Sequence, residues 1–161
     1  TELGISHVLE RRRVFPHLTV KQNLSLGAWH PKAKDELSNS LEKIYKIFPK
    51  LETRSNQLAK TMSGGEQQML AIARGMMGLP KLLMVDEPFL GLSPMVVKDL
   101  IKIFKNIVSE GISILFVEQN VRLALSMADR GYVLESGRLV VSGNSDDLIE
   151  SDKVKKVFLG N

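Results

Sequence analysis

Cysteine is absent from the 161 residues, which excludes a disulfide scaffold and thiolate metal sites. Long hydrophobic runs are absent as well, since the apolar stretches span only a handful of residues and TELGISHVLERRR has no signal-peptide hydrophobic region. The three histidines, His7, His17 and His30, have no metal-ligand spacing. These absences favour a cytosolic protein without a membrane span.

The net charge of the chain is small, because basic and acidic residues nearly balance. The net charge is +4, and the one dense basic cluster is Arg11-Arg12-Arg13. A nucleic-acid interface needs a longer basic stripe interleaved with aromatic side chains, and the sequence has none. The cluster is therefore interpreted as a solvated turn, and no nucleic-acid partner is expected.

The sequence does contain enough apolar material for one compact domain, because 43% of its residues are hydrophobic and 25% are charged. Ile5–Leu9 is predicted to be a short strand. Residues 14–78 show helical periodicity, with one apolar stripe before Pro49 made of Leu37, Leu41, Ile44, Tyr45 and Phe48. KLLMVDEP is a continuous apolar run, which predicts a strand buried on both faces of a parallel sheet.

Helices and strands alternate in the second half. Ser93 and Pro94 predict the start of a helix that ends at Gly111 and buries Val97, Leu100, Ile101, Phe104 and Val108. ISILFVEQN predicts a second buried strand, residues 121–128 a helix, and GYVLE a third strand. This order is typical of parallel βαβ units, so the predicted fold class is α/β.

The last segment is predicted to leave this alternation. YVLESGRLVVSG indicates a hairpin that turns at Ser136-Gly137. Two short helices are expected to start near Asn144 and Ser151.

The stretch TMSGGEQQMLAIARG, residues 61–75, opens a helix in an unusual way. Ser63 with Glu66 three residues later is a capping box, which accounts for two of the opening residues without any function. Gly64 and Gly65 each cost about 1 kcal/mol relative to alanine inside a helix. They are explained if a ligand must approach the backbone closely, and the N–H groups at a helix amino terminus suit a phosphate.

Asp86 and Glu87 stand at the carboxyl end of a predicted central strand, where open α/β sheets bind ligands. Adjacent residues point to opposite sides of a strand, so one carboxylate can face a metal ion and the other a water molecule. For phosphoryl transfer, Asp86 would hold Mg²⁺ through its water shell and Glu87 would polarise the attacking water. The alternative is an acidic turn before Pro88, but the glycine-opened helix nearby favours nucleotide chemistry.

SGGEQQMLAIARG followed by LLMVDEP resembles the signature motif and the Walker B motif of ATP-binding cassette (ABC) ATPases. VFPHLTVKQNL is similar to the segment after that family's Q-loop, and ADRGYVLESGRLVVSG to its C-terminal strand pair. The resemblance implies a P-loop NTPase-like parallel sheet with a helical subdomain at residues 14–78. Residues 1–13 and 79–161 would form the remainder of the α/β core and the C-terminal elements.

Three positions depart from the usual pattern of the family. Glu10 stands at the Q-loop position, Gln119 at the switch-histidine position, and Ser93 in place of the D-loop acid. With the stretches RRVFP, VEQN and GLSP, this combination resembles the ATP-binding subunits of branched-chain amino-acid importers. Gln119 can donate a hydrogen bond to the γ-phosphate but cannot take up a proton as histidine can.

The resemblance implies ATP and Mg²⁺ as cofactors and a role for each candidate residue. The signature loop would grip the γ-phosphate of ATP bound mainly to the second subunit of a head-to-tail dimer. The implied cofactor-binding residues are Ser63, Gly64, Gly65, Glu66, Gln67 and Glu10. The implied metal ligands are Asp86 and Glu10, and the implied catalytic residues are Glu87 and Gln119.

The resemblance also implies partners and a location. The region Glu10–Trp29 would face the coupling helix of a transmembrane permease, although ordinary core packing explains Phe15 and Trp29 equally well. A periplasmic or extracellular binding protein would act indirectly. The protein would then lie on the cytoplasmic side of the cell membrane as a peripheral subunit.

No Gly-Lys pair occurs in the sequence, so the Walker A pattern G-x-x-x-x-G-K-[ST] is absent. Family members carry that loop upstream of the point where this chain begins, so the resemblance covers the C-terminal two thirds, and Thr1 is interpreted as a truncation point. The missing strand would lie beside ISILFVEQ and leave an apolar sheet edge unpaired. We expect the 161 residues alone neither to hydrolyse ATP nor to bind it tightly.

Three functions compete at this point. The first is an ATPase subunit, here incomplete, that drives amino-acid import. The second is a non-catalytic subunit that supplies only its signature motif to a partner's ATP site. The third, a DNA-repair or chromosome-associated cassette ATPase, is set aside because only one short helical segment separates Glu10 from Ser63. Substrate identity rests on the resemblance alone, because the transported molecule contacts other subunits.

Overall fold

The computed structural model describes residues 2–152 and 154. The chain divides into two compact units, Thr1–Val117 and Glu118–Asn161, and each is described by itself. Among the described residues, no helix has the length and apolar character needed to cross a membrane.

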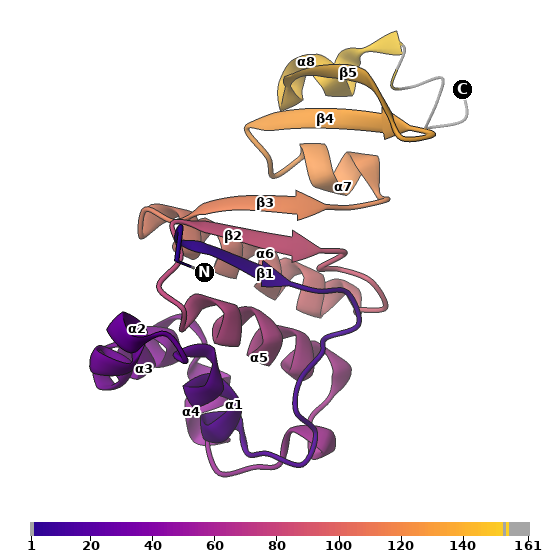
Figure 1. The fold of residues 1–161 in the computed structure, drawn as a ribbon. Coiled ribbons are helices and arrows are strands. Elements are labelled where there is room, and N and C mark those ends of the chain that lie inside the picture. Colours follow the sequence, from indigo (N-terminus) through magenta and orange to yellow (C-terminus); the bar gives the residue numbers. More distant parts are fainter. Residues whose placement is uncertain (1, 153, 155–161) are drawn as a thin grey trace. The chain divides into compact units, whose positions relative to one another are not determined.

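The first unit is built on a parallel sheet of β1 (Ile5–Val8), β2 (Leu82–Asp86) and β3 (Ser113–Val117), in the order β1-β2-β3 (Figure 1). Val8 pairs with Val85, and Asp86 pairs with Val117. The three strands therefore end together, and the segments that follow them leave from one edge of the sheet. These strands confirm the predicted α/β class.

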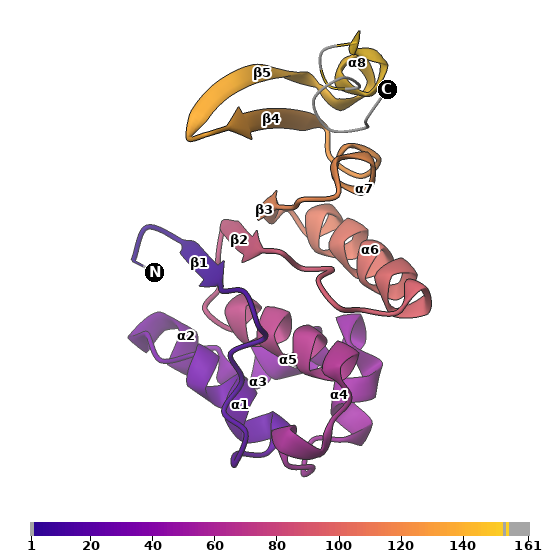
Figure 2. The same ribbon diagram turned by 90° about the vertical axis from the view of Figure 1, so that its right-hand side faces the viewer.

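Two helices cover the same face of this sheet. α5 (Gly64–Met76) packs on it through Gly75, where an added Cβ would lie 2.8 Å from Val8 Cγ2, and α6 (Pro94–Ser109) packs through Phe104 against Phe116. The register places Val8 and Phe116 on one face, and Figure 2 shows both helices beneath the sheet. The expected burial of β2 on both faces is met on one face only, because Leu83 and Val85 are buried while Leu82 and Met84 are half-buried.

The helical segment between β1 and β2 is made of short elements. They are α1 (Val20–Gly27), α2 (Pro31–Asp35), α3 (Leu37–Ile47), α4 (Pro49–Thr53), the 3₁₀ turn η1 (Ala59–Thr61) and then α5. The predicted stripe is confirmed at Ile44 and Phe48, which are buried, but Leu37, Leu41 and Tyr45 are only half-buried. Pro49 ends α3 as expected and is the first residue of α4.

α6 begins at Pro94 as predicted, with Ser93 as its N-cap residue, although the Ser93 side chain makes no capping hydrogen bond. Its buried face is rotated from the prediction, since the buried residues are Leu100, Ile103, Phe104 and Ile107. Val108 was expected to be buried and is 51% exposed. The reason is tertiary: Phe104 packs against Phe89 and Phe116, which sets the centre of the buried face.

The second unit contains α7 (Val121–Leu125), β4 (Arg130–Glu135), β5 (Arg138–Asn144) and α8 (Ser145–Glu150). The predicted hairpin is confirmed, because β4 and β5 are antiparallel and Ser136 and Gly137 both have positive φ, 50° and 76°. The core of this unit is formed by Leu125, Val133, Leu148 and Val154.

The expected parallel pairing of GYVLE was wrong for the described residues, in which β4 is hydrogen-bonded only to β5. An apolar run such as GYVLE is compatible with a parallel or an antiparallel partner strand. The turn at Ser136-Gly137 places β5 beside β4 as an antiparallel partner. α8 confirms the helix expected near Asn144. The second expected tail helix, from Ser151, falls for the most part outside the described residues.

Candidate functional site

The amino terminus of α5 is fixed by the predicted capping box. The Ser63 hydroxyl accepts a hydrogen bond from the Glu66 N–H at 3.4 Å, and the Glu66 carboxylate accepts one from the Ser63 N–H at 2.9 Å. The Ser63 hydroxyl also donates to Glu66 Oε2 at 2.9 Å. Three hydrogen bonds between these two residues therefore hold the loop in one conformation.

Glu66 has a second partner that sequence spacing did not reveal. Arg54, which caps α4, lies 3.2 Å from the Glu66 carboxylate. Partial burial alone would raise the pKa of Glu66, but the Ser63 hydrogen bonds and the cations Arg54 and Lys50 outweigh it and hold the pKa below its ordinary value. The carboxylate is thus explained by the structure of the loop itself.

The two glycines at this helix start have different neighbours. A Cβ on Gly65 would lie 2.7 Å from Val96 Cγ1, so Gly65 allows the first turns of α5 and α6 to approach closely. A Cβ on Gly64 would lie 2.5 Å from an Arg12 guanidinium nitrogen. Gly65 therefore has a packing reason, whereas Gly64 leaves room for a flexible cationic side chain.

Two backbone donors remain at this helix start. The N–H groups of Glu66 and Gln67 are bonded to the Ser63 side chain and carbonyl. Within residues 2–152 and 154, no acceptor is found for the N–H groups of Gly64 and Gly65. An anion could accept from them, as the sequence predicts.

Gln67, also predicted to bind the cofactor, is already engaged. Its side-chain amide donates to the carbonyl of Ala59 in η1 at 3.0 Å. This bond ties η1 to the start of α5. A nucleotide contact from Gln67 would have to use its remaining hydrogen-bonding positions.

The carboxylates are arranged along the edge where the parallel strands end. Asp86 is the last residue of β2, and Glu10 lies two residues beyond β1, where its carboxylate is 3.3 Å from Arg11 Nε. Glu87 is not a continuation of the strand: its φ is 43°, and its N–H donates to the carbonyl of Val117 at 3.0 Å. The strand alternation that the sequence suggested for Asp86 and Glu87 therefore stops at Asp86, and a left-handed turn sets the direction of Glu87.

No cluster of three or more potential metal-ligating side chains forms in the described part of the chain. This is compatible with Mg²⁺, which is usually held by one or two carboxylates together with substrate phosphates. Asp86 and Glu10 are carboxylates at the correct edge for such a site, and their role as ligands stays a prediction. Gln119 lies two residues beyond β3 and belongs to the second unit.

A cavity of about 350 Å³ lies beside α5, between the end of β1, the loop that follows it and the end of α1. Its lining includes Arg12, Arg13, Phe15, Trp29 and Arg74. Phe15 is 49% exposed and Trp29 60% exposed, so neither is an ordinary core residue. Hereafter this hollow is called the β1–α5 cavity.

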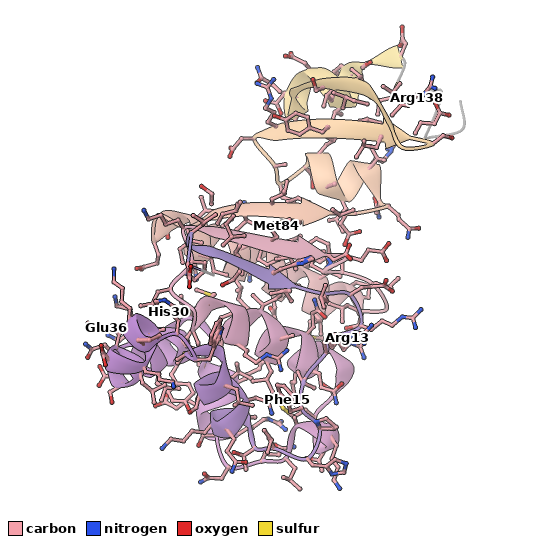
Figure 3. The ribbon with its side chains drawn as sticks, viewed as in Figure 1. Arg13, Phe15, His30, Glu36, Met84 and Arg138 are labelled. Atoms are coloured by element: carbon pink, nitrogen blue, oxygen red, sulfur yellow. The ribbon has the colours of Figure 1, made fainter. Side chains whose placement is uncertain are left out.

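The wall of the β1–α5 cavity is braced from α5 and α1. Arg74 donates to the carbonyl of Arg13, and its guanidinium stands over the Phe15 ring at 5.0 Å from the centroid (Figure 3 labels Arg13 and Phe15). The buried side chain of Asn23 accepts from the Phe15 N–H at 2.9 Å and donates to its carbonyl at 3.0 Å. Sequence reasoning missed Arg74 and Asn23, although an asparagine inside an apolar helical stripe was a detectable signal.

Comparison with known proteins identifies the family. Residues 1–90 match the ABC transporter family. The high-affinity branched-chain amino acid transport ATP-binding protein BraG of Pseudomonas aeruginosa is 46% identical over 98% of this chain and 67% of its own length. The probable branched-chain amino acid transport ATP-binding protein LivF of Archaeoglobus fulgidus is 37% identical over 99% of the chain and 68% of its own length.

A solved structure supports the same family assignment. The chain superposes on cbiO1 of Clostridium perfringens, part of the ABC transporter complex cbiONQ, with a TM-score of 0.81 and 27% identity. The match covers 98% of this chain and 64% of that one, so the chain spans about two thirds of the length of the relatives that it matches. By sequence and by fold, the chain belongs to the ABC transporter ATPase family.

Proposed function

We propose that the chain is part of the ATP-binding subunit of an importer that couples ATP binding and hydrolysis to branched-chain amino-acid uptake. The observation that carries this proposal is the 46% identity with BraG over nearly the whole chain. The identity with LivF points to the same class of substrate. Glu10, Gln119 and Ser93 would then be features of this subfamily.

The start of α5 suits a phosphate that arrives from a second ATPase subunit. The N–H groups of Gly64 and Gly65, which have no acceptor among the described residues, lie at the positive end of the α5 dipole, and Ser63 is held beside them. In the proposed head-to-tail dimer, this loop would bind the γ-phosphate of ATP held mainly by the other subunit. Glu66 and Gln67 would act by keeping the loop in shape.

At the carboxyl edge of the sheet, Asp86 would hold Mg²⁺ together with the phosphates, and Glu10 would contact the same ion or its water shell. The ion would neutralise charge on the phosphates. Glu87 would orient the attacking water and take its proton as the water oxygen bonds to the γ-phosphorus and the bond from that phosphorus to the leaving oxygen of ADP breaks. Gln119 would donate a hydrogen bond to the γ-phosphate.

The β1–α5 cavity supports a permease contact on this chain. It is lined by residues of the region Glu10–Trp29 and by Arg74, and its exposed Phe15 and Trp29 side chains suit an apolar helix end of a partner. We propose that a transmembrane permease subunit docks here, with a binding protein acting only through the permease. The ATPase subunit would then be peripheral, on the cytoplasmic side of the membrane.

The 161 residues include no Gly-Lys pair, so they hold no Walker A loop for the β- and γ-phosphates. We propose that these residues alone do not hydrolyse ATP or bind it tightly. The first measurement is the intact mass of the native protein. A mass well above 18.0 kDa predicts an upstream Walker A segment and the ordinary two-site mechanism. A mass of 18.0 kDa favours a subunit that supplies only its signature motif to a partner's ATP site.

Mixing experiments separate these two functions. A non-catalytic subunit is expected to show ATPase activity only after a partner carrying a Walker A loop is added. ATP hydrolysis by the purified 161 residues, without a partner subunit, would contradict both versions of the proposal.

Glu87→Gln tests the proposed chemistry in the native transporter. The amide keeps the shape of the side chain but cannot take a proton, so ATP is expected to stay bound while hydrolysis falls at least about 100-fold. Nucleotide retention by filter binding and phosphate release measure the two effects, and Glu110→Gln, an exposed glutamate at the end of α6, is the control. Wild-type hydrolysis in Glu87→Gln would remove Glu87 as the base.

A further inference from the structure

The side chain of Arg12 joins two regions that the proposed function treats separately. It lines the β1–α5 cavity, and its guanidinium lies directly over Gly64 at the start of α5. The same guanidinium is the nearest group to Gly91, in the loop after β2, where a Cβ would lie 3.7 Å from it. The Arg12 side chain thus lines the cavity, packs on Gly64 and lies near the loop that follows Asp86.

The backbone of Arg12 is held in an uncommon conformation to achieve this. Arg11, Arg12 and Arg13 have φ values of 64°, 65° and 31°, in a region that residues other than glycine rarely occupy. Such a run persists only when its surroundings hold it. The Arg74 bond to the Arg13 carbonyl and the Asn23 bonds to Phe15 fix the segment just beyond Arg12.

The contact of Arg12 with Gly64 is one of packing rather than of pairing. Within the residues that the structure describes, the Arg12 guanidinium has no hydrogen-bond acceptor or ion-pair partner. A cation at a helix amino terminus is also disfavoured by the helix dipole. Arg12 is therefore held over Gly64 by the shape of its own loop, and a shift of that loop moves the guanidinium on the signature loop.

We propose that Arg12 is a positioning residue that transmits the position of the loop after β1 to the signature loop. The proposal rests on the proposed function, because it assigns Arg12 an effect on nucleotide binding at Gly64. An occupant of the β1–α5 cavity that moves Arg12 would then also act on the start of α5. The solvated turn that the sequence suggested for the arginine cluster describes Arg11 and Arg13, which are exposed, but not half-buried Arg12.

The experiment uses the native transporter with Arg12→Ala, Arg12→Lys and the control Lys60→Ala. Lys60 is an exposed cation four residues before Gly64, and the three atoms nearest to an added Cβ on Gly64 all belong to Arg12. For Arg12→Ala, the apparent KM for ATP is expected to rise about fivefold while kcat changes less than about twofold, because the contact positions the loop in both the ground state and the transition state. Arg12→Lys should recover a large part of the loss, and Lys60→Ala should behave as wild type.

A double-mutant cycle with Gly64→Ala tests the contact itself. An added methyl at Gly64 displaces the guanidinium in the wild type but has no such neighbour in Arg12→Ala. The change in KM of the double variant is therefore expected to differ by about fivefold or more from the product of the two single changes. Multiplicative effects, or an Arg12→Ala KM equal to that of Lys60→Ala, would overturn the proposal. Equal thermal midpoints for all variants show that folding is not the cause.

Amide hydrogen exchange separates this proposal from the proposed function. Arg12→Ala is expected to speed exchange at the start of α5, and Lys60→Ala is not, whether or not the transporter hydrolyses ATP. If the native transporter does not hydrolyse ATP, the proposed function fails while exchange still reports the Arg12 contact. If exchange at Glu66 and Gln67, whose N–H groups are hydrogen-bonded to Ser63, is unchanged in Arg12→Ala, the positioning role fails while the proposed function stands.

Discussion

Gly65→Ala distinguishes a packing role of the second signature glycine from a phosphate-binding role. The added Cβ would lie 2.7 Å from Val96 Cγ1 and 3.0 Å from Val96 Cγ2, well inside the roughly 3.5–4.0 Å at which carbon atoms attract. Both groups stand on the first turns of helices, so rotation of one flexible side chain does not relieve the overlap. Overpacking of this kind costs about 1–3 kcal/mol, against a gain of up to about 1 kcal/mol from replacing glycine in a helix. With the middle of each range, the expected net loss is about 1.5 kcal/mol.

Urea unfolding of the native subunit measures this loss, and Val96→Ala in the same molecule removes the methyl groups that collide. We expect Gly65→Ala/Val96→Ala to be more stable than the two single effects added together, because the collision is absent. If ATP hydrolysis also returns in the double variant, packing accounts for Gly65. If stability returns but hydrolysis does not, the phosphate needs the bare backbone. An unfolding midpoint of Gly65→Ala equal to that of the wild type would refute the packing account.

Three further predictions follow from other parts of the chain. The folded-state pKa of Glu66 is below its ordinary value of 4.5, so the stabilisation from its carboxylate is complete above that value and is lost as pH falls through the folded pKa. Glu66→Gln should therefore lower the free energy of unfolding by about 1 kcal/mol at pH 7 and by less at pH 4. Urea titrations at the two pH values measure the difference. Gly131→Ala places a methyl 2.7 Å from Leu125 and 2.8 Å from Leu148 and should destabilise the second unit by about 1–3 kcal/mol, with faster proteolysis of residues 118–161 as the readout. Trp29→Ala, at a side chain 60% exposed, should leave the unfolding midpoint within about 0.5 kcal/mol of wild type while weakening co-purification with the permease; intact co-purification would remove Trp29 from the proposed docking surface.

Local features of the site were predictable from the sequence. The capping box of Ser63 and Glu66 depends on residues three apart, and the position of Asp86 depends on the length of one apolar run. Both are decided within a few residues of chain, so spacing alone indicates them. The hairpin at Ser136-Gly137 is of the same kind, because the turn residues themselves adopt positive φ.

Features that depend on distant residues were not predictable. Nothing near Gly64 in the sequence indicates that Arg12 covers it, and nothing near Glu66 indicates the ion pair with Arg54. The direction of Glu87 follows from a left-handed backbone and a bond to Val117, neither of which strand periodicity contains. These contacts appear only when β1, β2, β3 and the helices are brought together.

The two halves of the proposed ATP site differ in what holds them in shape. Ser63 is fixed by three hydrogen bonds to Glu66, and Glu66 is fixed by the ion pair with Arg54. The signature loop is therefore ordered before a ligand binds, so binding loses little free energy to ordering the loop. Glu87 and Gln119, in contrast, belong to different compact units. Substitutions in the signature loop should therefore change local stability and phosphate affinity together. Glu87→Gln, which lies outside that loop, should instead change hydrolysis while phosphate affinity at the signature loop stays the same.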